Sequence, residues 1–142
     1  MQNMLRHVEK AIVLFLCGGG IYAAIEILWR GYTHWTMAVL GGLLFLVIGG
    51  LNNWFSWDMS LVFQGVVGGV IITIAEFAAG LILNIYLGLG VWDYSEMAGN
   101  VLGQICPQFT LVWMVLSVIA VIVDDWLRYR LFGEERPSYH LI

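Results

Sequence analysis

Apolar residues gather in long uninterrupted blocks along this chain. Four such segments, separated by short polar connections, cover 11–29, 35–51, 61–87 and 109–127. A helix needs about 20 apolar residues to cross the hydrocarbon core of a bilayer, and each segment reaches or nearly reaches that length. Because backbone polar groups in lipid must be satisfied within the segment, the pattern predicts helices. We therefore expect an all-α membrane protein with four transmembrane helices in a single domain over 1–142.

Composition agrees with this prediction. Of 142 residues, 61% are hydrophobic and 11% charged, and the mean hydropathy is +0.85. Soluble proteins are usually about 45–50% apolar and about 25% charged. The net charge of −4 excludes a nucleic-acid-binding protein, which needs a basic surface. We expect Cys17 and Cys106 to be free buried thiols, and the scattered histidines predict no metal or cofactor site.

The distribution of basic residues predicts the orientation. Four spans put both termini on one side, and that side holds five of the six basic residues: Arg6, Lys10, Arg128, Arg130 and Arg136. Only Arg30 lies on the other side. The positive-inside rule then predicts cytoplasmic termini, an outward loop at 88–108 and a flexible cytoplasmic tail at 134–142.

Two glutamates interrupt the apolar segments, and a carboxylate inside a membrane is costly. Glu26 and Glu76 lie fifty positions apart, and a Gly-Gly pair precedes each at the same spacing. At 1.5 Å per residue, both are about 22 Å from the inner edge of the membrane. The first and third spans therefore look like a parallel repeat with a pseudo-twofold axis along the membrane normal.

Residues four apart share a helix face, which groups Glu26 with Arg30, and Glu76 with Gly80 and Asn84. One interpretation is an outward-facing polar site under the outer loop. The alternative is a structural ion pair between Glu26 and Arg30, with Glu76 protonated or bonded to Asn84 or a loop amide. The candidate binding residues are Glu26, Arg30, Glu76, Gly80, Asn84, Trp92, Asp93, Tyr94, Ser95, Asn100 and Gln104.

The outer loop is too apolar and aromatic to be an ordinary surface loop. Asp93-x-x-Glu96 resembles a capping box, which predicts a short interfacial or re-entrant helix, and Pro107 either stops that helix or begins the last span. Two Gly-x-x-x-Gly patterns, at 65–69 and 99–103, predict close helix packing.

Acidic residues near the end of the last span suggest a metal-diphosphate site, but the inner loop supplies only Asp58 as a further carboxylate. An ion pair between Asp124 and Arg128, four residues apart, explains Asp124 better. The chain has no phosphate-binding loop and no Ser-His-Asp order, so standard ATPase and hydrolase signatures are absent from the sequence.

Four motifs carry a resemblance to a known family. They are GGxxYxxxE followed by an arginine (18–30), WxMxxxGGxxF (35–45), ExxxGxxxN (76–84) and WDYSxxxxNxxGQIC (92–106). With these motifs the chain resembles the bacterial ABC-transporter type B (CmpB-like) permease family. It departs from the pattern at Met97-Ala98, where the family has Leu-Pro. The resemblance implies a multi-pass protein of the bacterial plasma membrane with a permease role.

Three functions follow as hypotheses. The first is a transport or substrate-binding component in which Glu76 binds a cation or exchanges a proton, while Arg30 holds an anionic group or neutralises Glu26. Its partners would be membrane lipids, an ion or small molecule, and a second copy or a partner membrane subunit. The second is an enzyme acting on a lipid or isoprenoid head group, with Glu76 or Asp93 as general base. The third is a structural subunit held by its glycine faces.

Overall fold

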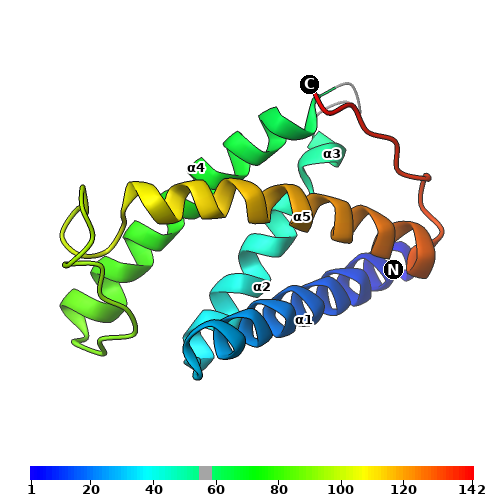
Figure 1. The fold of residues 1–142 in the computed structure, drawn as a ribbon. Helices are drawn as coiled ribbons and strands as arrows, with labels where there is room; N and C mark the ends of the chain where they lie inside the picture. The colour runs from blue at the N-terminus through cyan, green and yellow to red at the C-terminus, as the bar shows by residue number, and fades with distance from the viewer. Residues whose placement is uncertain (55–58) are drawn as a thin grey trace. The chain divides into compact units, whose positions relative to one another are not determined.

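The computed structural model describes residues 1–54 and 59–142, and these residues contain helices and no strand (Figure 1). In chain order the elements are α1 (Gln2–Arg30), α2 (Trp35–Gly49), α3 (Leu51–Trp54), α4 (Leu61–Gly80), the π-helix η1 (Leu81–Tyr86) and α5 (Pro107–Phe132). The all-α prediction is confirmed, because four helical stretches are long and apolar enough to cross a membrane. Asp58 lies outside the described residues.

Local sequence signals explain where the helices begin and end. α1 ends at Gly31, which has a φ of 81° and donates its N–H to the Ile27 carbonyl. Glycine adopts this left-handed conformation without steric cost. The imidazole of His34 accepts a hydrogen bond from the Thr36 N–H at the start of α2, and the Ser60 hydroxyl caps α4 in the same way.

The chain divides into two compact units. Unit 1 contains Met1–Met59 and Ala120–His140, and unit 2 contains Ser60–Ile119 and Leu141–Ile142. Each unit contains an antiparallel helix pair. The pair is α1 with α2 in unit 1, and α4 with the first half of α5 in unit 2.

Glycines bring the backbones of α1 and α2 together. A Cβ added at Gly19 would lie 2.6 Å from the Ala38 carbonyl oxygen, and one added at Gly42 would lie 2.8 Å from the Phe15 carbonyl oxygen. These two glycines therefore allow close packing of the two helices. In Figure 1 the two helices meet at the Gly31–His34 connection and run in opposite directions.

A buried polar network lies in the second half of α5. The predicted pair is confirmed, since Arg128 Nε lies 2.5 Å from Asp124 Oδ2. Asp125, which the sequence left unexplained, accepts hydrogen bonds from Asn52 at 2.5 Å and from the Tyr139 hydroxyl at 3.0 Å. Burial and then the charge of Asp125 raise the pKa of Tyr139. These contacts connect α3, α5 and the C-terminal segment within unit 1.

The segment after α5 has neither helix nor strand. Besides the Tyr139 contact, it forms an ion pair between Glu134 and Lys10 of α1. Its flexibility stays a prediction.

The α1–α2 contact yields a matched test. Gly19→Ala should destabilise the protein by about 1–3 kcal/mol, because the new methyl group collides with backbone. Gly20→Ala meets no atom within 4 Å, so it should be neutral or stabilising by up to about 1 kcal/mol. Thermal unfolding in detergent measures both. Equal melting temperatures for the two variants would contradict the described packing.

Candidate functional site

Glu76 is the buried carboxylate of unit 2. It lies on α4 one turn before Gly80, and its side chain is 4% exposed. After Gly80 the helix widens into η1, where the Leu87 N–H donates to the Ile82 carbonyl. Glu76 and Gly80 therefore share a face of α4 as predicted. The wider turn changes the register before Asn84.

Gln104 of the outer loop packs against α4 and η1. A Cβ added at Gly80 would lie 2.5 Å from Gln104 Oε1, so only glycine leaves room for this amide. Asn84 Nδ2 donates to Gln104 Oε1 at 2.8 Å, and Asn84 Oδ1 accepts from the Val91 N–H at 2.6 Å. The Trp92 indole donates to the Gln104 carbonyl at 3.0 Å. Gly80, Asn84, Trp92 and Gln104 thus anchor the loop to the helix.

The rest of the loop consists of turns. The Asp93 carboxylate accepts from the Ser95 N–H at 2.9 Å and from the Ser95 hydroxyl, and these bonds lower the pKa of Asp93. Asn100 Oδ1 accepts from the Gly103 N–H at 2.9 Å. Gly99 and Gly103 have φ values of 74° and 71°. The predicted short helix and capping box are wrong, because left-handed glycines interrupt any helix here, and the two glycines form turns rather than a packing face.

These turns bring Tyr94 to Glu76. The ring of Tyr94 stacks on Phe109 of α5 with centroids 4.8 Å apart and planes 9° apart. Its hydroxyl donates to Glu76 Oε2 over 3.4 Å. The sequence predicted Asn84 or a loop amide as the alternative partner of Glu76, and the structure gives Asn84 other partners. Tyr94 was a candidate from its motif alone, and nothing in the sequence predicted this contact.

Between the start of α4 and Glu76, α4 and α5 pack closely. A Cβ added at Gly65 would lie 2.9 Å from the Met114 carbonyl oxygen, and one at Gly69 would lie 3.1 Å from the Met114 Cα. The packing role predicted for this glycine pair is confirmed. The hydroxyls of Thr73 and Thr110 meet at 2.9 Å between the helices. Sequence analysis missed this contact, which joins residues 37 positions apart.

Glu26 and Arg30 belong to unit 1, and the other nine candidates belong to unit 2. Arg30 Nε lies 2.7 Å from Glu26 Oε2, so the predicted ion pair is present. Thr33 donates to the same carboxylate at 3.4 Å, and the guanidinium lies 4.6 Å from the centroid of the Tyr32 ring. Glu26 is therefore paired with a cation on its own helix.

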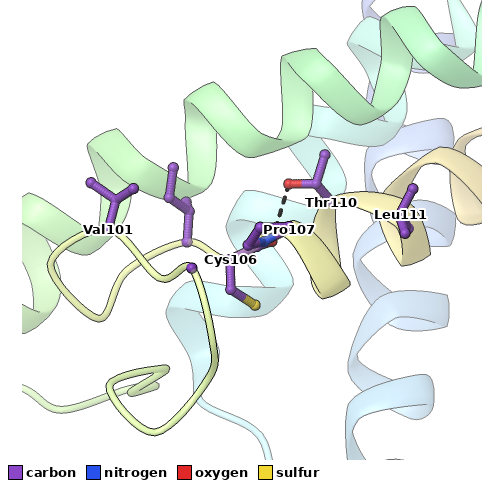
Figure 2. Close-up of a pocket in the computed structure, with 7 residues that line it drawn as sticks. Val101, Cys106, Pro107, Thr110 and Leu111 are labelled. Atoms are coloured by element: carbon purple, nitrogen blue, oxygen red, sulfur yellow. Dashed lines mark hydrogen bonds between the residues drawn. The ribbon is translucent and has the colours of Figure 1, made fainter.

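An apolar pocket of about 370 Å³ lies where the loop joins α5 (Figure 2). Its lining residues are Gly99, Val101, Ile105, Cys106, Pro107, Thr110 and Leu111. The Thr110 hydroxyl donates to the Cys106 carbonyl at 3.2 Å beside it. Cys106 is a buried free thiol as predicted, whereas Cys17 is free and half-buried. The lining has no charged side chain, and the Cys106 thiol is its titratable group.

Comparison with protein families gives a match over most of the chain. A family model with the description "Putative ABC-transporter type IV", of the CmpB type, matches residues 14–134. No curated protein and no solved structure matches the chain.

The loop anchor can be tested at Asn84. Asn84→Ala should destabilise the protein by about 1–3 kcal/mol, because it leaves the Val91 N–H and Gln104 Oε1 without this partner. Hydrogen exchange should become faster in residues 87–106. Asn53→Ala is the control, because Asn53 is exposed. Unchanged exchange in the loop of Asn84→Ala would show that these bonds do not hold it.

Proposed function

The chain belongs to the family described as Putative ABC-transporter type IV, and we propose that it is a transport component of the bacterial plasma membrane whose ion-exchanging group is Glu76. The family assignment agrees with the CmpB-like resemblance and corrects its subtype from B to IV. Four helices able to cross a membrane support the membrane location.

The burial of Glu76 is the observation that carries the proposal. The side chain is 4% exposed within the apolar stretch Leu61–Tyr86. Ionisable residues inside membrane segments are costly and commonly mark the paths of ions or protons. The partner that the loop supplies is the hydroxyl of Tyr94, a neutral group that permits a carboxylate to exchange its ligand.

Glu26 has a charged partner on its own helix. Arg30 lies 2.7 Å away and compensates its charge, which favours a structural ion pair. Arg30 is then occupied by Glu26 rather than kept for an anionic substrate. We assign ion exchange to Glu76 alone.

Two other functions receive less support. An enzyme acting on lipid head groups needs a lateral opening beside its base, and the low exposure of Glu76 counts against one. A structural subunit held through Gly65 and Gly69 needs that face for another chain, but Met114 of the same chain fills it. Four spans are few for a complete transport pathway, so we expect assembly with a second copy or a partner membrane subunit. The distribution of basic residues favours cytoplasmic termini.

Ion exchange at Glu76 is measurable without knowing the substrate. Protein in liposomes on a solid-supported membrane is exposed to jumps of Na⁺, K⁺ or pH, and the charge displacement is recorded. We expect a transient current for at least one jump, and its loss in Glu76→Gln, because the amide cannot exchange a cation or a proton.

Glu135→Gln provides the matched control, since it makes the same change at an exposed glutamate that has no part in the proposed site. Its current should equal that of the unchanged protein. Glu26→Gln should lower the melting temperature while keeping the current. A full current in Glu76→Gln would overturn the proposed function.

A further inference from the structure

The surroundings of Glu76 offer few ligands for a metal cation. Calcium takes six to eight oxygen ligands and magnesium requires six in near-octahedral geometry. Within residues 1–54 and 59–142, no group of three or more His, Cys, Asp or Glu side chains is arranged to hold a metal ion. The Tyr94 hydroxyl contacts Glu76, and Thr73 lies three residues before Glu76 on α4. A proton needs only one acceptor and one donor.

The hydroxyls of Thr73 and Thr110, which lie toward the start of α4 from Glu76, already have hydrogen-bond partners. Thr73, one turn earlier on the same face, donates to the Gly69 carbonyl at 2.8 Å, and Thr110 donates to the Cys106 carbonyl at 3.2 Å. Their mutual contact is 2.9 Å, so two hydroxyl protons serve three contacts. Beyond this pair, Met114 packs against glycine backbone. On this side of Glu76 within unit 2, the hydroxyls already have hydrogen-bond partners and the next side chain, Met114, is apolar.

Tyr94 provides the connection on the other side. Its ring is half-buried, and its hydroxyl reaches the buried carboxylate of Glu76. The O···O distance of 3.4 Å exceeds the usual range of about 2.5–3.0 Å for this type of bond. The ring is held by its stacking on Phe109, and rotation about the C–O bond lets the hydroxyl hydrogen point toward or away from Glu76.

We propose that the ligand exchanged by Glu76 is a proton and that the Tyr94 hydroxyl transfers it. We call the Tyr94 hydroxyl in this role the proton port. The inference rests on the proposed function of Glu76. In the forward step the Tyr94 O–H gives its proton to the Glu76 carboxylate, while the Tyr94 oxygen takes one from a hydronium ion at the loop surface. Tyr94 is regenerated neutral, Glu76 becomes a neutral acid, and one water molecule is released.

Acidic residues flank the port in the sequence. Tyr94 is the titratable group that contacts Glu76 from the loop, and α5 contributes the neutral residues Phe109 and Thr110 to this region. Asp93 and Glu96 flank Tyr94 in sequence and are exposed. Their negative charge favours protons at the loop surface, where the transfer begins.

Tyr94→Phe tests the port cleanly, because it keeps the ring that stacks on Phe109 and removes only the hydroxyl. Infrared difference spectra of the protein in lipid follow the carboxyl bands of Glu76 after a pH jump, and Glu76→Gln assigns these bands. We expect the response to slow about tenfold or more in Tyr94→Phe. Tyr86→Phe is the control, since Tyr86 is 85% exposed in the same unit and its variant should respond normally.

Each outcome decides the inference. An unchanged rate in Tyr94→Phe overturns the port, and slowing in Thr110→Val instead would assign entry to the opposite side. Glu76 bands that change with the Na⁺ or K⁺ concentration at constant pH would overturn the claim that the exchanged ligand is a proton. If the pH-jump response depends on Tyr94 while Glu76→Gln keeps its transport current, the proposed function fails and the proton port stands.

Discussion

The contact between Gln104 and Gly80 determines the geometry of the site. The amide of Gln104 fits against the helix only because residue 80 has no side chain. Asn84 then donates to the side-chain oxygen of Gln104 and Trp92 to its backbone carbonyl. This contact fixes the outer loop on α4. Since Tyr94 lies on that loop, its position over Glu76 follows from the fit of one amide against one glycine.

Glycines serve the same physical purpose in both units. Hydrophobic burial gives no driving force between helices in lipid, so close van der Waals packing has to provide it. Gly19 and Gly42 let α1 and α2 approach, and Gly65 and Gly69 let α4 and α5 approach. The two glutamates that suggested a repeat differ in their partners, because Glu26 pairs with Arg30 and Glu76 contacts Tyr94. The repeat itself stays a prediction.

Local patterns predicted what depends on local physics. Apolar length predicted the four long helices, and i,i+4 spacing predicted the pairs of Asp124 with Arg128 and of Glu26 with Arg30. The same local patterns predicted the wrong structure for the loop. Gly99 and Gly103 match a helix-packing pattern, but their backbones adopt left-handed turns.

Contacts between residues far apart in the chain could not be predicted from the sequence either. Asn52 and Asp125 are 73 positions apart, and Thr73 and Thr110 are 37 apart, so no periodicity connects them. The π-helix after Gly80 has no glycine or proline signal within Leu81–Tyr86, and it alters the register on which the spacing of Asn84 was interpreted.

The most direct measurement concerns the dependence of Glu76 on the loop. Gly80→Val places a side chain where Gln104 Oε1 lies and leaves both Glu76 and Tyr94 unchanged. If the Gln104 contact positions Tyr94, the infrared carboxyl bands of Glu76 in this variant will shift to those of Tyr94→Phe. Bands identical to those of the unchanged protein, in a variant that remains folded, would contradict the account.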